Sequence, residues 1–193
     1  MPFRRVCVFS DPSPDAGPEH RELAASVGWL LADNGLTLVF PASASAAGAE
    51  LADAVTGAGA PAICVATPAT VDLMAALPGL SERRMAEDIE ERNAVLAELS
   101  DGFLALPGGI ASLEDLFAIW TWGGFHQKPC GLLNRADYYT GLLHTPNDAL
   151  LDRYVRESQR GMLIADRDPA VLLRAMADFR PPETRRFQSF DDA

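Results

Sequence analysis

The residues best suited to chemistry surround one turn in the middle of the chain, inside the stretch DGFLALPGGIASLEDL. An apolar run ends at Pro107, Gly108 and Gly109, and a helix over residues 112–122 is predicted to follow. Glycines let a backbone approach a ligand closely, and the N–H groups and positive dipole end of a helix N-terminus favour an anion. The turn therefore predicts a phosphate site formed by Gly108, Gly109 and Ser112.

The same segment allows an interpretation without a ligand. The order Ser112, Leu113, Glu114, Asp115 is typical of a capping box, in which Ser112 is the N-cap and Asp115 reaches back to its N–H. Strand-to-helix turns of this kind are common, and the pattern is short. The turn alone leaves both interpretations open, and the capped helix is the commoner case.

An arginine in the preceding helix favours a ligand. Along a helix predicted over residues 82–99, apolar side chains and one arginine recur at intervals of three and four, and this spacing places the arginine on the core-facing side. A buried guanidinium keeps its charge, and leaving it unpaired costs several kcal/mol. Its expected partners are Glu114, Asp115 or a bound phosphate; a structural salt bridge or a position at the helix edge is the alternative. The stripe consists of Met85, Ile89, Arg92, Leu96 and Leu99.

The elements that position these residues alternate short apolar runs with helical patterns, one of them over residues 137–157. Continuous apolar strands with crossover helices are typical of a parallel sheet covered on both faces. The fold class is therefore predicted to be α/β, a doubly wound parallel sheet in a single domain over residues 1–180, with residues 181–193 as a flexible tail. The predicted strands are RVCVF, LTLVF, PAICVA, GFLAL, PCGLLN and MLIAD.

The loops that follow the strands are the candidates for ligand contact, because ligands bind such sheets beyond the carboxyl ends of the strands. The helix with Arg92 leads directly into the strand before the glycine turn, so the two belong to neighbouring segments. The loops concerned are Ser10 to Ser13, residues 41–47, the residues from Thr67 onward, residues 107–112 and the turn after Asn134.

Composition argues against several partners. The 193 residues carry a formal net charge of −11, which repels nucleic-acid phosphates, so no nucleic acid is expected. No apolar stretch approaches the roughly 20 residues that span a bilayer, and the N-terminus lacks a signal-sequence pattern, so no membrane is expected and the protein is predicted to be cytoplasmic. Cys7, Cys64 and Cys130 lie in predicted strands without paired spacing, which predicts buried thiols and no metal site. The single lysine, Lys128, precedes Pro129 at a strand start and suits neither a Schiff base nor a phosphate loop.

One long run of residues resembles a known family. The run IEERNAVLAELSDGFLALPGGIASLEDLFAIWTWGGFHQKPCGLLN is similar to the LONELY GUY (LOG) family of cytokinin riboside 5′-monophosphate phosphoribohydrolases, sometimes labelled lysine decarboxylases. It parallels that family's M-H-x-R-K helix, its P-G-G-x-G-T-x-x-E turn and its W and K-P-x-G-L-L-N segments, and the similarity extends over roughly residues 5–178. The resemblance implies a Rossmann-like fold, usually a homodimer, that hydrolyses the N-glycosidic bond of a nucleoside monophosphate to a free base and ribose 5-phosphate without a metal or cofactor.

Carried over position by position, the resemblance assigns roles to single residues. Arg92 matches the family's catalytic arginine, Asp115 stands at its catalytic glutamate, and Glu114 matches the other acid of the usual pair. The substrate-binding residues that it implies are Gly108 and Gly109 of the P-G-G, Ala111 and Ser112 at the G-T, and Ser10 and Ser13 in the segment aligned with an N-terminal C-G-S-S.

The chain also departs from the family pattern. The lysine that follows the catalytic arginine is Asn93, and the glycine-rich phosphate loop corresponds to residues 41–49, which keep only Gly48. Loss of loop glycines removes backbone conformations that such a cradle uses.

Two functions therefore stay open. The first is a diverged nucleoside 5′-monophosphate N-glycosidase, in which Arg92 anchors the substrate and Asp115, alone or with Glu114, acts at the ribose. The second is a non-catalytic relative that binds a nucleotide or another small anion, or serves as a subunit partner. In both cases a homodimer is predicted, with the residues around Trp120, Trp122 and Phe125 at its interface.

Overall fold

The computed structural model describes residues 3–10, 17–144 and 157–181, and within these ranges the chain forms one parallel sheet. Its seven strands run in the order β4-β3-β2-β1-β5-β6-β7, and every pairing between them is parallel. The winding direction reverses between β1 and β5, which makes this pair the topological switch point. The strands are β1 Arg5–Phe9, β2 Thr37–Pro41, β3 Ala62–Ala66, β4 Glu82–Met85, β5 Gly102–Ala105, β6 Cys130–Leu133 and β7 Leu163–Asp166.

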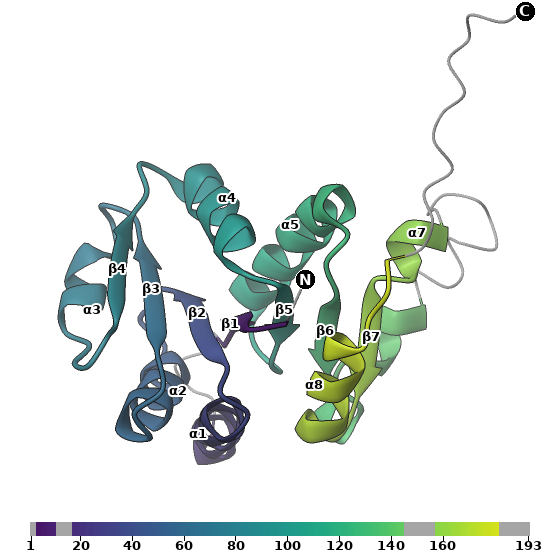
Figure 1. The fold of residues 1–193 in the computed structure, drawn as a ribbon, viewed down its shortest axis with the longest axis horizontal. Coiled ribbons are helices and arrows are strands. Elements are labelled where there is room, and N and C mark those ends of the chain that lie inside the picture. Colours follow the sequence, from purple (N-terminus) through teal and green to yellow (C-terminus); the bar gives the residue numbers. More distant parts are fainter. Residues whose placement is uncertain (1–2, 11–16, 145–156, 182–193) are drawn as a thin grey trace, which may run out of the picture.

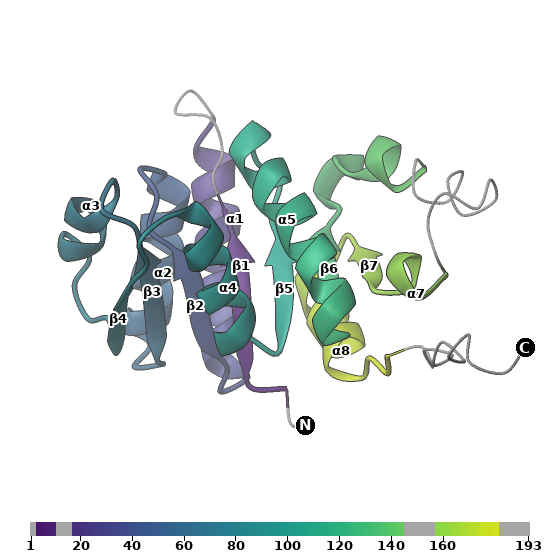
Figure 2. The same cartoon turned by 90° about the horizontal axis from the view of Figure 1, so that it is seen from above.

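Helices cover both faces of the sheet, as Figures 1 and 2 show. Helices α1, α2 and α8 lie on one face, and α4 and α5 lie on the other. This arrangement confirms the predicted α/β, doubly wound, Rossmann-like fold. The helices are α1 Pro18–Asp33, α2 Ala46–Gly57, α3 Val71–Ala75, α4 Ile89–Leu99, α5 Ile110–His126, α7 Glu157–Arg160 and α8 Pro169–Ala177, with a short 3-10 turn, η1, at Arg135–Asp137.

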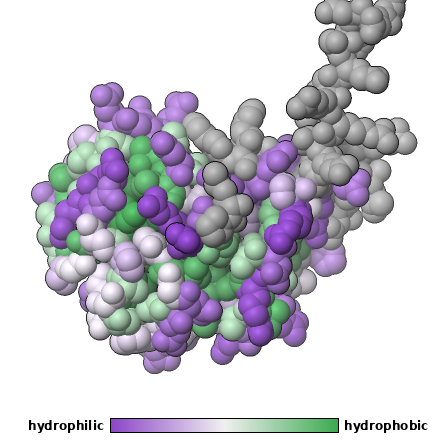
Figure 3. Space-filling model, in the orientation of Figure 1, coloured by the Kyte–Doolittle hydropathy of each residue, from purple (hydrophilic) through white to green (hydrophobic). Residues whose placement is uncertain are grey.

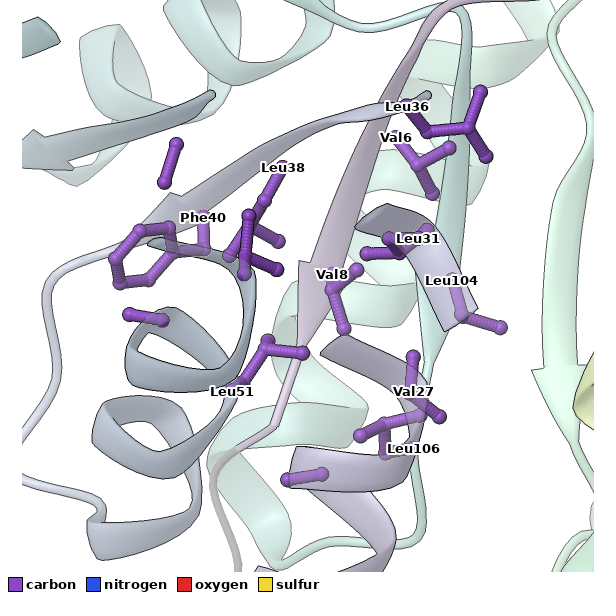
Figure 4. Packing of buried hydrophobic residues seen from close by; sticks show 14 of the residues in the cluster. Val6, Val8, Val27, Leu31, Leu36, Leu38, Phe40, Leu51, Leu104 and Leu106 are labelled. Atoms are coloured by element: carbon purple, nitrogen blue, oxygen red, sulfur yellow. The ribbon is translucent and has the colours of Figure 1, made fainter. Parts of the chain in front are cut away.

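The core forms on both sides of the central strands. Successive residues of a strand point to opposite faces, so Val8 of β1 packs toward α1 and α2 while the flanking Cys7 and Phe9 pack toward α4 and α5. Figure 4 shows the first of these layers, where Val8, Leu38 and Leu51 meet between the sheet and its helices. Because β1, β3 and β5 are buried on both faces, their sequences are continuous apolar runs, and the strands predicted from those runs are confirmed.

The helix predicted over residues 82–99 is wrong in its first half. Residues Glu82–Met85 form β4, which pairs with β3 at the edge of the sheet, and α4 begins only at Ile89. An edge strand has a solvent-facing side, and charged residues there discourage pairing with other chains. The sequence of β4 is therefore polar, and three of its four residues are exposed. Because Met85 belongs to this strand, it is not part of the predicted stripe along α4.

The three cysteines are free and buried, as predicted. Burial raises the pKa of the Cys64 and Cys130 thiols to about 12. Burial also raises the pKa of Cys7, and the nearby carboxylate of Asp115 adds to the shift. Because the thiolate is the nucleophilic form, these cysteines are not suited to covalent catalysis.

Lys128 stabilises the end of α4. Its ammonium Nζ donates hydrogen bonds of 2.7 Å to the carbonyl oxygens of Ala97 and Ser100, and burial lowers the pKa of the lysine. The last carbonyls of a helix lack intrahelical partners, and a cation satisfies them well. Lys128 therefore stabilises a helix end at the edge of the sheet where the strands begin. This edge is opposite the carboxyl ends of the strands, where a ligand is expected.

Some sequence predictions fall on residues outside the described ranges. These are Ser13, residues 145–156 of the helical region predicted over 137–157, and residues 182–193 of the predicted tail. Within the described ranges, no helix has the length and apolar character that crossing a membrane requires.

Candidate functional site

A cavity of about 190 Å³ lies at the carboxyl ends of β1 and β2, beside the switch point. The ends of those strands form its floor, and the first turns of α2, α4 and α5 form its walls. Its ionisable lining residues are Arg92 from α4 and Glu114 and Asp115 from α5. The structure thus brings Arg92 to the adjacent acids Glu114 and Asp115, although Arg92 and Asp115 lie 23 positions apart in the sequence.

An ion pair between Arg92 and Asp115 dominates this cavity. Nη2 of Arg92 donates to Oδ1 of Asp115 at 2.5 Å, and the two side chains are only 13% and 14% exposed. Such low exposure leaves little water to screen the pair. The expectation that Arg92 is largely buried, within reach of Glu114, Asp115 or a bound anion, is therefore confirmed, with Asp115 as the partner.

Helix α4 places Arg92 at its first turn, beside the carboxyl ends of the strands. The N-cap is Asp88, whose side chain accepts a hydrogen bond of 2.9 Å from the N–H of Glu91. The carboxylate of Glu91 in turn accepts from the N–H of Glu87, so the helix start is held from both sides. Leu96 and Ala97 bury the opposite end of the helix against the sheet. The guanidinium is thus carried by a capped and anchored helix.

Asn93 is the buried neighbour of Arg92, with 6% of its surface exposed. Its Oδ1 accepts hydrogen bonds from Nε and Nη2 of Arg92, at 3.2 and 2.9 Å. Arg92 therefore has two partners among the described residues, the amide of Asn93 and the carboxylate of Asp115.

The start of α5 differs from the predicted capping box. The helix begins at Ile110 with Gly109 as its N-cap, so Ser112 lies inside the first turn, where it is fully buried. Ser112 is therefore not the N-cap that the predicted capping box requires, and Asp115 pairs with Arg92. Because glycine has no side chain, the N-cap residue supplies no hydrogen bond to the first N–H groups of this 17-residue helix. Those N–H groups, including that of Ala111, begin beside the cavity.

Two tyrosines from the loop after β6 hold the turn before α5. The buried hydroxyl of Tyr139 donates to the carbonyl of Leu106 at 2.7 Å, and the hydroxyl of Tyr138 donates to the carbonyl of Gly108. Burial raises the pKa of Tyr139, so this hydroxyl stays a donor over the physiological range. The side chain of Asn134 fixes the loop by accepting from the N–H of Tyr139 at 2.6 Å. The turn is thus clamped from outside its own segment.

The loop over residues 41–49 contributes to the lining of the cavity, although Gly48 is its only glycine and the corresponding loop of the family is glycine-rich. Ser45 caps α2 by accepting from the N–H of Gly48, and Ser43 accepts from the N–H of Ser45. A side-chain carbon added at Gly48 would meet Ser43 Oγ at 3.4 Å and the carbonyl of Ser10 at 3.6 Å, which is ordinary contact. The loop here is therefore a serine-capped helix start in which even the remaining glycine is not sterically required.

Ser10 directly follows β1 and lines the cavity, with 9% of its surface exposed. Ser13 lies outside the described residues. Gly108 and Gly109 have ordinary negative backbone φ angles, so this turn does not use the left-handed conformations that only glycine adopts freely. In the part of the chain that the structure describes, no cluster of three His, Cys, Asp or Glu side chains could hold a metal ion.

Comparisons with known proteins show the family of the chain. A family model described as "Possible lysine decarboxylase" matches residues 49–176, which is more than half of the chain. A cytokinin riboside 5′-monophosphate phosphoribohydrolase of Rhodococcoides fascians is 33% identical over 168 residues, covering 86% of this chain and 85% of that protein. The chain belongs to the LOG family. A probable LOG enzyme of Oryza sativa subsp. japonica is 32% identical over 182 residues, covering 93% of this chain and 74% of that protein.

Among solved structures, the molybdenum cofactor carrier protein of Chlamydomonas reinhardtii is similar with a TM-score of 0.65. It covers 90% of this chain and 95% of its own, at 16% sequence identity. At this identity the likeness concerns the fold alone. It supports the Rossmann-like sheet of this LOG-family chain and carries no information on its ligand.

Sequence reasoning missed the residues that hold the candidate site in shape. Asn93 was noted only as the loss of a lysine, and its contact with Arg92 has no pattern in the sequence. Tyr138 and Tyr139 follow β6 and Asn134 in the sequence, and this adjacent aromatic pair was the available signal for the clamp.

Proposed function

We propose that this LOG-family protein is a nucleoside 5′-monophosphate N-glycosidase that releases a free base and ribose 5-phosphate. The observation that carries the proposal is the Arg92–Asp115 pair, a cation and a carboxylate held 2.5 Å apart in a cavity at the carboxyl edge of the sheet. The names of the relatives, which print cytokinin riboside 5′-monophosphate as the substrate, support the same class of reaction.

Asp115 acts at the ribose in this proposal. The bond between C1′ and the base nitrogen breaks, its electron pair leaves with the base, and the base takes up a proton. A water oxygen then adds to C1′ and loses a proton. The sugar passes through an oxocarbenium-like state, so a carboxylate beside it stabilises the positive charge or orients the water. Glu114 is exposed at the rim of the cavity and is the second acid available to this step.

The 5′-phosphate is placed at the start of α5. The first N–H groups of that helix and its positive dipole end suit an anion, and Arg92 supplies the charge. Among the described residues that line the cavity Arg92 is the one cation, against two acids. Binding therefore depends on the backbone of α5 as well as on the guanidinium.

A panel of substrates tests the proposed reaction. Purified protein is incubated with cytokinin riboside 5′-monophosphate, with the common ribonucleoside 5′-monophosphates, and with the matching nucleosides. We expect chromatography to detect free base and ribose 5-phosphate from at least one monophosphate, and none from its nucleoside, because the nucleoside lacks the anchoring group. If no monophosphate releases base while one still binds, the alternative of a non-catalytic nucleotide-binding relative holds. The cytoplasmic location stays a prediction.

We also propose that the protein is a homodimer. Large apolar side chains are exposed on α4 and α5: Ile89 of α4 is 57% exposed, and Ile110 and Phe117 of α5 are 82% and 44% exposed. Figure 3 shows apolar surface lying between polar side chains in the view of Figure 1. Trp120 is half-buried, and its Nε1 donates to the carbonyl of Gln159 within the same chain. The side chains of Trp122 and Phe125 lie outside the described part of the structure.

The expected result is a mass of twice one chain in light scattering at micromolar concentration. Phe117→Glu places a charge in the exposed apolar surface and is expected to shift the protein toward monomers. Val171→Glu, at an exposed apolar position of α8 on the other face of the sheet, is the matched control and leaves the mass unchanged. A wild-type monomer under these conditions contradicts the proposal.

A further inference from the structure

Asn93 makes contacts that a residue chosen only for packing would not need. It is buried, and a buried amide needs partners for its polar atoms. Both hydrogen bonds to its oxygen come from the guanidinium of Arg92, from Nε at 3.2 Å and from Nη2 at 2.9 Å. A guanidinium is a donor only, so the amide oxygen, and not the amide nitrogen, must face it. The orientation of the Asn93 amide is therefore fixed by its neighbour.

Arg92 keeps two of its N–H donors for a ligand. A guanidinium has five N–H groups. Asn93 takes the one on Nε and one on Nη2, and Asp115 takes the other one on Nη2. The two on Nη1 have no acceptor among the described residues. Arg92 can therefore donate from Nη1 to an anion and keep both partners. It cannot form a bidentate pair with that anion, because each such pair also needs an N–H of Nη2.

A lysine at position 93, as in the family that the sequence resembles, could not accept these hydrogen bonds from Arg92. An ammonium has donors and no acceptor, so it cannot receive hydrogen bonds from Arg92. Two adjacent cations would also repel one another. The asparagine is therefore more than a lost positive charge, because it supplies the acceptor that fixes the plane of the guanidinium between Asp115 and the cavity.

We propose that Asn93 is a positioning residue: its amide oxygen holds the guanidinium of Arg92 against Asp115 and leaves Nη1 alone to contact the substrate. The inference rests on the proposed function for the identity of that substrate, whereas the positioning itself does not depend on it. Asn93 touches neither substrate nor reacting atoms in this scheme and acts only through Arg92.

Two variants separate positioning from packing. Asn93→Leu keeps the size of the side chain and removes the acceptor, so kcat for base release is expected to fall by about 10- to 100-fold, the range that a lost charge-assisted hydrogen bond produces. Asn93→Asp keeps the acceptor in the same place and adds a negative charge. It is expected to keep most of the turnover but to raise KM for the monophosphate. Equal losses of kcat in both variants, or none in Asn93→Leu, overturn the inference.

A measurement independent of activity reads the positioning directly. In ¹⁵N NMR of the wild-type protein, the Nε–H of Arg92 is expected to exchange slowly with water, in contrast to that of exposed Arg174 on α8. Arg92→Lys identifies the signal by removing it. Slow exchange should survive in Asn93→Asp and be lost in Asn93→Leu, or in Asn93→Ala if the leucine variant does not fold.

The two hypotheses fail in different ways. Fast exchange of the Arg92 Nε–H in the wild type overturns the positioning role whatever the enzyme does and whichever variants fold. Wild-type protein that shows slow exchange but releases no base refutes the proposed N-glycosidase and leaves the positioning of Arg92 by Asn93 supported.

Discussion

Base release is expected to become at least about 10²-fold slower when Asp115 is replaced by alanine, while affinity for the monophosphate stays close to that of the wild type. The carboxylate is needed only when positive charge develops on the ribose, whereas the phosphate is held by Arg92 and the start of α5. Removing one preorganised electrostatic group from a site typically lowers kcat by about 10²- to 10³-fold. Chromatography of the free base and calorimetry of the bound monophosphate measure the two quantities separately.

Asp115→Ala also leaves Arg92 without its carboxylate partner, so the variant needs a companion. In the wild type Oδ1 of Asp115 lies 2.5 Å from Nη2 of Arg92. Asp115→Asn can keep an oxygen acceptor there while removing the charge, and it should lose base release to a similar extent. Asp72→Ala, at an exposed acid of the remote helix α3, is the matched control for purification and assay. If both Asp115 variants turn over at the wild-type rate, Asp115 is not the catalytic acid. Glu114→Gln then tests the other acid at the rim.

The central strands could be predicted from the sequence because burial on both faces requires a continuous run of apolar residues. All residues of β3 and β5 are buried, so each strand had to be apolar along its length. Polar strand β4 has the opposite environment. It lies at the sheet edge, its residues Glu82, Arg83 and Arg84 carry charge, and its short run of letters merges with the helix that follows. The expectation of one long helix was the result.

The position of Arg92 was predicted correctly from a stripe that is only partly real. Met85 belongs to a strand and Ile89 is 57% exposed, whereas Asn93 and Leu96 are among the buried residues of α4. What carried the prediction was the cost of an unpaired buried guanidinium, which holds whichever side chains share its face. The free-energy cost of an unpaired buried charge therefore predicted the burial and pairing of Arg92 better than the periodicity of apolar residues did.

The local interactions of the site could not be predicted, because they depend on which segments meet in space. The letters of a capping box occur at Ser112 and Asp115, yet the helix begins two residues earlier and Asp115 pairs with Arg92, 23 positions away. The hydroxyl of Tyr139 reaches the carbonyl of Leu106, 33 positions away. A one-dimensional pattern contains the residue types for such contacts but not the distances.

Arg92→Ala is expected to remove most of the preference for a monophosphate over its nucleoside. The variant loses the one cation among the described cavity residues, and it leaves Glu114 and Asp115 to repel the phosphate. A charge-assisted hydrogen bond contributes about 1.5–3 kcal/mol, so the ratio of the two dissociation constants should shrink by about 10- to 100-fold. Calorimetry with a monophosphate and its nucleoside measures that ratio in the wild type and the variant. Arg174→Ala on α8 loses an exposed arginine of the other sheet face and serves as the matched control.

The outcome of this comparison also decides what the turn before α5 does. If Arg92→Ala keeps a small remaining preference, the N–H groups that follow Gly109 contribute to phosphate binding, because no other charged donor lines the described cavity. Arg92→Lys should fall between the alanine variant and the wild type, since an ammonium restores the charge but cannot bond to Asn93 and Asp115 in one plane. If the preference survives unchanged in Arg92→Ala, the arginine is a structural partner of Asp115 only. If the wild type has no preference, the glycine turn is a strand-to-helix connection and the phosphate site is refuted.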